Sequence, residues 1–85
     1  MAEDQVGVVI NYYTKPGVAA IKVTGDRIQK GDLLTYRGYT TDFTETVDSM
    51  QIENQPVEEA KTGDLVGVKV KERVREKDKV YRVTE

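Results

Sequence analysis

Four cations recur at every second position near the end of the chain, at Lys69, Lys71, Arg73 and Arg75. These four residues are called the basic row, and they stand at odd positions, whereas Val66, Val68 and Val70 stand at even ones. Successive side chains of a strand point to opposite faces, so the spacing predicts cations roughly 6.7 Å apart on an outer face. That interval is close to the spacing of phosphates along an extended single strand, so the row could follow an RNA backbone. The alternative is a solvated face that keeps the strand from pairing with a neighbour.

A second candidate binding segment runs from residue 37 to residue 44 and holds Arg37, Tyr39 and Phe43 among three threonines and Asp42. Arginine and aromatic side chains in polar loops are frequent anchors of binding sites. Tyr39 or Phe43 could stack on a nucleic-acid base. The alternative is that Phe43, the only phenylalanine, enters the core and that the threonines are ordinary strand formers.

Catalytic chemistry has little support in the residue types present. Two carboxylates from the set Asp42, Glu45 and Asp48 could serve a hydrolase, but there is no nucleophile motif and Ser49 is the only serine. The chain has no cysteine and no histidine, which excludes disulfides, thiolate nucleophiles, imidazole catalysis and structural zinc. The EF-hand spacing of oxygen ligands is absent as well. We therefore expect a protein that is not an enzyme and holds no metal and no cofactor.

Charge is distributed unevenly along the sequence. Residues 42–64 hold seven carboxylates against one lysine, a balance of −6, and residues 65–84 hold seven cations against three carboxylates, a balance of +4, although the whole chain carries only −2. The last third is therefore where an RNA would bind. The acidic stretch from residue 42 to residue 64 is where a basic protein partner would bind.

Apolar residues alternate with period two along most of the chain, and no window has helical periodicity, so strands are predicted throughout. The first strand is expected to bury Val6, Val8, Ile10 and Tyr12. The second is expected to bury Ala19, Ile21 and Val23 after a turn at Pro16-Gly17. A later strand is expected to bury Val66, Val68 and Val70.

The apolar pattern changes parity between Phe43 and Ile52, which predicts a β-bulge near Asp48-Ser49. Several short strands broken by glycine turns favour an all-β fold, a small antiparallel β-barrel, because closure removes exposed edges. A chain of 85 residues supports one core. We expect a disordered tail at residues 1–4 and a single barrel domain at residues 5–85. No leader or membrane-spanning run is evident, so a cytoplasmic location is expected.

Two segments resemble a known family. Residues 56–68, PVEEAKTGDLVGV, and residues 28–34, IQKGDLL, are similar to domain 2 of elongation factor Tu and related translation GTPases, and the resemblance covers roughly residues 5–83. The GTPase phosphate loop is absent, so no nucleotide is expected. The resemblance implies a translation-factor-like module that contacts tRNA, the ribosome or a translation-associated partner. Similar barrels also occur, less closely, at the carboxyl end of collagenase-like peptidases associated with RNA modification. The alternative is therefore a protein-interaction barrel or an accessory barrel of such an enzyme.

Overall fold

A computed structural model describes residues 2–39 and 41–84, and these contain ten strands and no helix. The strands are β1 (Ala2–Tyr13), β2 (Val18–Val23), β3 (Arg27–Gln29), β4 (Leu33–Arg37), β5 (Asp42–Thr46), β6 (Met50–Ile52), β7 (Gln55–Pro56), β8 (Glu59–Lys61), β9 (Leu65–Lys69) and β10 (Lys79–Thr84). Over these two ranges, accordingly, no helix is long and apolar enough to cross a membrane.

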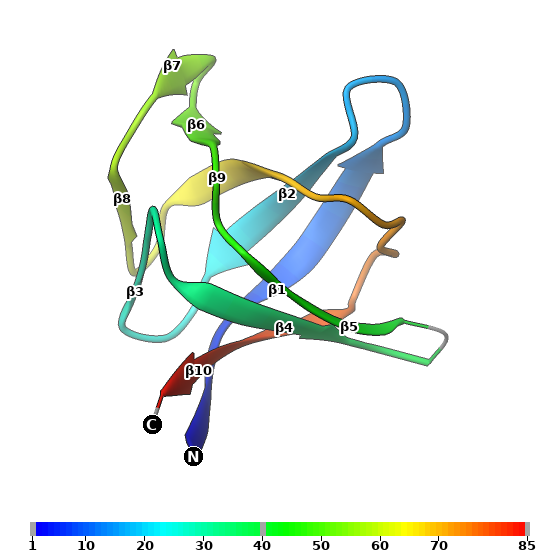
Figure 1. Ribbon diagram of the computed structural model, residues 1–85. Coiled ribbons are helices and arrows are strands. Elements are labelled where there is room, and N and C mark those ends of the chain that lie inside the picture. The colour runs from blue at the N-terminus through cyan, green and yellow to red at the C-terminus, as the bar shows by residue number, and fades with distance from the viewer. Residues whose placement is uncertain (1, 40, 85) are drawn as a thin grey trace.

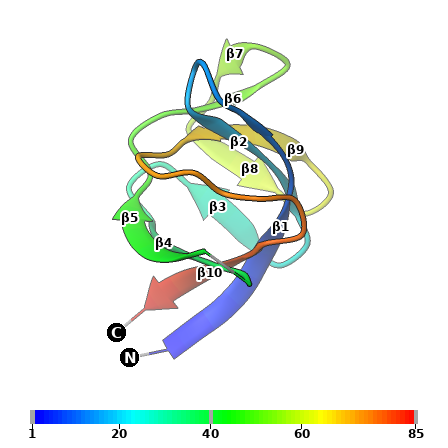
Figure 2. The same ribbon diagram turned by 90° about the vertical axis from the view of Figure 1, so that its right-hand side faces the viewer.

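Eight strands form one antiparallel sheet in the order β5-β4-β10-β1-β2-β9-β6-β7, and β3 pairs with β8 in a separate ribbon. Figures 1 and 2 show the sheet curling around a central core, with the ribbon closing one side. The first and last strands, β1 and β10, are paired, so the two ends of the chain lie side by side (Figure 1). The prediction of an all-β, small antiparallel barrel is confirmed.

The core is built mainly from the inward residues of β1, β2, β4 and β9, together with single residues of β3, β6, β8 and β10 and three valines between strands. Alternation correctly predicted the buried set in two strands, which is Ala19, Ile21 and Val23 in β2, and Val66 and Val68 in β9 with Val70 just beyond it. Leu34 and Tyr36 of β4 are also buried, whereas Leu33 is exposed. The paired strands therefore present one valine-rich face to the interior.

The prediction for β1 was wrong in part. Val6 and Val9 are buried, whereas Ile10 is 41% exposed. The pairing register of β1 shifts between Gln5 and Gly7 against β10, and again between Val9 and Asn11 against β2. An extra residue in a strand reverses which face the following side chains occupy. The bulges therefore place Ile10 outside the core.

Residues 2–4, where a disordered tail was expected, are the beginning of β1 and pair with Arg82, Val83 and Thr84 of β10. The carboxylate of Glu3 also accepts a hydrogen bond of 2.9 Å from the guanidinium of Arg37. Strand pairing and this ion pair give the segment partners that an acidic tail would lack. Met1 lies outside the described residues.

The predicted change of parity after Phe43 is present, but it takes the form of a break between two strands. β5 ends at Thr46, β6 begins at Met50, and residues 47–49 have no strand geometry. Val47 and Met50 are both 2% exposed although their positions differ in parity. The break therefore turns the chain while keeping both side chains in the core.

One turn recurs three times and holds the strand ends. The carboxylate of its last residue, Asp32, Asp64 or Asp78, accepts a hydrogen bond of 2.8–2.9 Å from the backbone N–H three residues earlier. The residue before each aspartate has a positive φ, which is 96° at Gly31, 92° at Gly63 and 75° at Lys77. The two Gly-Asp pairs are therefore recurring turn chemistry, and Lys77-Asp78 repeats it without glycine.

Candidate interaction surface

The outer face of the β1–β2–β9–β6 region is unusually apolar. In β2 the inward residues Ala19 and Ile21 alternate with Val18 and Ala20, which therefore point outward. Ala20 pairs with Gly67 of β9, and Gly67 pairs in turn with Gln51 of β6. Small side chains on neighbouring strands thus lie together at the middle of this face.

This face holds a groove of about 540 Å³. We call it the apolar groove, and it is lined by Ile10, Tyr13, Pro16, Val18, Ala20, Gln51, Glu53, Asn54, Leu65, Val66 and Gly67. A smaller recess of about 240 Å³ shares Pro16, Val18, Gln51 and Gly67 with it and extends to Lys69. The hollow therefore runs across four neighbouring strands, β1, β2, β9 and β6, with β2 and β9 forming its middle.

Large apolar side chains stand at the margins of the groove. Ile10, Tyr13 and Leu65 are 41%, 50% and 56% exposed, and all three line it. Single exposed apolar residues are common on protein surfaces, but a contiguous apolar patch in a hollow is typical of interaction sites. The barrel core leaves these three side chains largely uncovered, so a partner could bury them.

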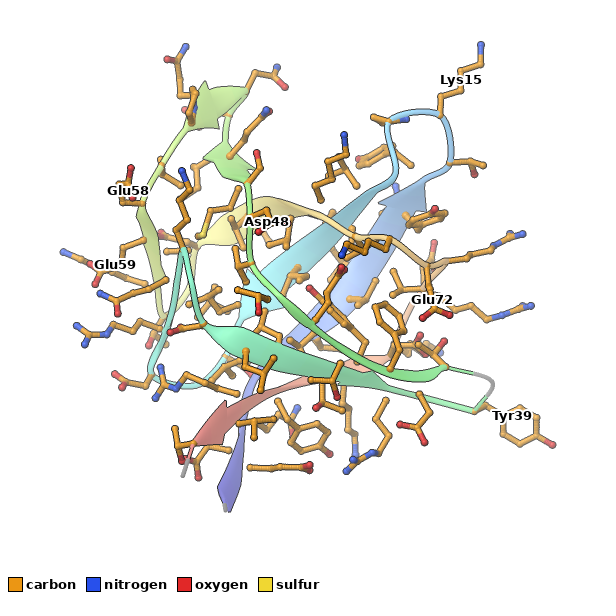
Figure 3. The ribbon with its side chains drawn as sticks, in the orientation of Figure 1. Lys15, Tyr39, Asp48, Glu58, Glu59 and Glu72 are labelled. Carbon is orange, nitrogen blue, oxygen red and sulfur yellow. The ribbon has the colours of Figure 1, made fainter. Side chains whose placement is uncertain are left out.

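The charges around the apolar groove are mainly positive. Lys22 pairs with Leu65, and Lys69 pairs with Val18, so both lysines belong to the same outer face. Lys15 projects from the turn between β1 and β2 (Figure 3). Glu53 is the carboxylate among the lining residues. A matching partner would therefore place apolar side chains in the groove and carboxylates around it.

The basic row does not form the regular outer face that was predicted. Lys69 is the last residue of β9, and Lys71, Arg73 and Arg75 lie in the connection to β10. The connection leaves strand geometry because it buries Val74 and Asp78, and the third aspartate turn lies within it. The cations are exposed, but their spacing is not that of a strand.

The three predicted residues of the segment 37–44 are separated by the structure. Arg37 binds Glu3 and lies over the ring of Tyr81, at 5.4 Å from its centroid. Tyr39 is fully exposed and projects from the β4–β5 hairpin (Figure 3). Phe43 is stacked on Tyr36 with ring centroids 4.9 Å apart and packs against the core. Thr40 lies outside the described residues.

The acidic stretch from residue 42 to residue 64 is spread over several elements. Glu58 and Glu59 lie at β8, and Asp48 lies between β5 and β6 (Figure 3). Glu59 forms an ion pair of 3.3 Å with Arg27, and Asp64 accepts the hydrogen bond of its turn. The stretch therefore offers several small acidic areas in place of one continuous acidic surface.

Tyr36 of β4 and Glu45 of β5 have shifted pKa values. Burial, with a smaller contribution from the charge of Glu45, raises the pKa of Tyr36, whose buried hydroxyl has no hydrogen-bond partner among residues 2–39 and 41–84. Burial also raises the pKa of Glu45, while its contacts with Lys71 lower it. Across residues 2–39 and 41–84, no cluster of three metal-ligating side chains is found.

Sequence comparison relates the chain to peptidases. An uncharacterized protease of Methanocaldococcus jannaschii is 44% identical over 82 residues, which cover 95% of this chain and 20% of the protease. A collagenase of Porphyromonas gingivalis is 36% identical over 78 residues, which cover 91% of this chain and 22% of the collagenase. The chain thus spans about a fifth of the length of the curated relatives it matches. No protein-family model matches it.

Solved structures share the fold. The C-terminal domain of a Geobacillus thermoleovorans protein assigned to the U32 peptidases superposes with a TM-score of 0.87 at 19% identity, covering 95% of this chain and 93% of that domain. GDP-bound aIF5B from Aeropyrum pernix superposes with a TM-score of 0.63 at 17% identity, covering 94% of this chain and 14% of the factor. At these identities the likeness concerns the barrel alone.

The comparisons correct the interpretation of the sequence as a translation-factor-like, RNA-binding module. The relatives in sequence are a protease and collagenases, whereas the translation factor shares only the fold and superposes less well than the peptidase domain. The segments around the two Gly-Asp turns form aspartate-capped turns and inward strands, which a barrel needs whatever it binds. The alternative, an accessory barrel of a collagenase-like peptidase, fits the relatives better.

Proposed function

We propose that this chain is a non-catalytic accessory barrel of a collagenase-like peptidase and that it docks on the larger, catalytic part of that enzyme through the apolar groove. The observation that carries the proposal is the similarity to a protease and to collagenases that are about five times longer than the matched region. A barrel attached to so large an enzyme needs a surface that is complementary to the rest of that enzyme. The apolar groove supplies such a surface.

The energetics favour the groove as the contact. Burying a large apolar side chain completely contributes about 1.5–3 kcal/mol, and Ile10, Tyr13 and Leu65 each have 41–56% of their surface still to bury. Association costs several kcal/mol of rotational, translational and side-chain freedom, so these three contacts alone give only weak binding. Carboxylates of the partner next to Lys22 and Lys69 would strengthen it and fix its orientation.

Binding without catalysis is the expected activity of the barrel. The chain lacks histidine and cysteine, and in the part of the chain that the structure describes the buried Tyr36 hydroxyl has no hydrogen-bond partner. General acid–base or nucleophilic catalysis needs paired groups within hydrogen-bond reach. In this proposal the larger part of the enzyme carries out the peptidase chemistry. The barrel positions that part or contacts other molecules.

Titration calorimetry tests the docking. The M. jannaschii protease, shortened by the 82 residues that match this chain, is titrated with the isolated barrel. We expect saturable binding that Leu65→Glu weakens at least tenfold, because about 1.4 kcal/mol of contact is lost when a carboxylate replaces the leucine. Leu33→Glu is the matched control, since Leu33 is 40% exposed and lies outside the groove. No binding, or an equal loss in both variants, would contradict the proposal.

A further inference from the structure

We propose that the free edge of β5 is a second binding site, which takes an extended basic peptide as an added strand. This site is separate from the apolar groove and does not depend on the proposed docking. It is formed by Asp42–Thr46 and by the beginning of the β9–β10 connection.

β5 is the end strand of the eight-stranded sheet and pairs only with β4. In an antiparallel pair, half of the backbone N–H and C=O groups of an edge strand point away from its partner. Among the described residues, no backbone–backbone hydrogen bond joins residues 42–46 to anything beyond β4. The outward backbone groups of β5 are therefore available to an incoming strand.

A recess of about 380 Å³ lies along this edge. Four consecutive residues of β5, from Phe43 to Thr46, line it. Consecutive strand residues point to opposite faces, so a hollow that contacts all four lies along the edge of the strand and not on one face. Lys71 and Glu72 form the opposite wall. The recess thus separates β5 from the next segment of the barrel wall.

A side-chain hydrogen bond crosses the recess between β5 and the β9–β10 connection. The carboxylate of Glu45 accepts a hydrogen bond of 3.0 Å from the backbone N–H of Lys71. No ladder of backbone hydrogen bonds accompanies that contact within the part of the chain that the structure describes. A peptide strand beside β5 would supply backbone partners at a place where, among the described residues, this is the one hydrogen bond between β5 and the β9–β10 connection.

The charged side chains that line the recess determine which kind of peptide would bind there. Glu45, Asp48 and Glu72 line the recess, and Lys71 is the cation among its lining residues. Phe43, stacked on Tyr36, adds a partly exposed aromatic surface. Pairing through the backbone gives affinity, and alternate side chains give specificity. A peptide with lysine or arginine at alternate positions matches this edge, whereas the phosphates of RNA would be repelled by the three carboxylates.

Fluorescence anisotropy with a labelled peptide of alternating threonine and lysine tests the site. At low salt we expect saturable binding, and the double variant Asp48→Asn/Glu72→Gln should weaken it at least fivefold. The matched control is Glu53→Gln/Glu58→Gln, which removes two exposed carboxylates outside the recess and should leave the affinity within twofold. Glu45 is left intact in both variants, so its hydrogen bond to Lys71 is retained.

A second measurement separates strand addition from simple charge attraction. Methylating alternate backbone nitrogens of the peptide removes their N–H donors without changing the charge of the peptide. Binding should be abolished when the methylated nitrogens are those that face β5. Hydrogen exchange of the amides of residues 43–46 should slow when the unmodified peptide binds. The proposal would be overturned by an absence of binding or by equal losses of affinity in the two double variants. It would also be overturned if the peptides methylated at the odd and at the even backbone nitrogens both bound with full affinity.

Discussion

Replacing Val68 by aspartate is expected to unfold the barrel. Val68 of β9 is fully buried and pairs with Ala19 on one side and Met50 on the other. An ionised carboxylate there would have no cation and no hydrogen-bond donor set around it. The cost is several kcal/mol, which is most of the roughly 5–15 kcal/mol that stabilises a small domain. Circular dichroism and urea titration measure the loss.

The matched control for Val68→Asp lies in the same strand. Leu65 is 56% exposed, so Leu65→Asp places the carboxylate in water and should leave the protein folded. Its free energy of unfolding should change by less than about 1 kcal/mol. Equal stability of the two variants would show that the inward and outward faces of β9 are assigned wrongly.

The second large effect is expected for Gly25→Ala, in the turn after β2. An added Cβ would lie 2.9 Å from the Cα of Val6 and would also clash with the carbonyl oxygen of Gln5. Both contacts are with backbone, so neither can move aside as a flexible side chain can. The N–H groups of Thr24 and Gly25 both donate to the carbonyl of Val6, and shifting the turn would strain these bonds. We expect a loss of about 1–3 kcal/mol in the free energy of unfolding.

Gly67→Ala is the control for that steric argument. The nearest atom to its added Cβ is a methyl group of Val18 at 3.1 Å, which can shift by a small side-chain movement. Its loss of stability in urea titration should therefore be clearly smaller than that of Gly25→Ala. If the two glycine variants lose the same free energy, backbone proximity at Gly25 is not the cause.

The sequence predicts much of the fold because burial follows alternation wherever a strand is regular. The inward positions of β2 and β9 were predicted correctly on that basis. In β1 the same rule failed between Val6 and Val9, where Val9 is buried in place of Val8, because a bulge depends on the register with β2 and β10 and leaves no mark in the local pattern. The basic row failed for a related reason, since β9 ends at Lys69 and the connection that follows is irregular and buries Val74 and Asp78.

The apolar groove was harder to predict than the core. Ile10 was counted as a core residue, and Leu65 lies next to a buried valine in sequence. Only the pairing of Tyr13 with Val18 and of Ala20 with Gly67 brings the lining residues onto one face. The sequence did contain one signal for this surface. Leu65 and Tyr13 are large and apolar, yet they fall outside the alternating inward positions of their strands.

The resemblance to translation factors predicted the barrel fold correctly, but the function inferred from it was wrong. The turns at Gly31-Asp32 and Gly63-Asp64 fix strand ends through a carboxylate and a residue with positive φ. Such turns serve any barrel of this shape, and the peptidase domain and aIF5B both superpose on this chain. Function resides in the surfaces that differ between proteins of one fold.

Lysine footprinting tests the central claim that the barrel docks through the apolar groove. The barrel is acetylated with and without the shortened M. jannaschii protease, and the modification of each lysine is measured by mass spectrometry. We expect Lys22 and Lys69, which flank the groove, to become at least severalfold less reactive in the complex. Lys30, which is exposed in the turn between β3 and β4 and lies outside the groove, should keep its reactivity. Protection of Lys30 with Lys22 and Lys69 unchanged would place the contact elsewhere and contradict the account.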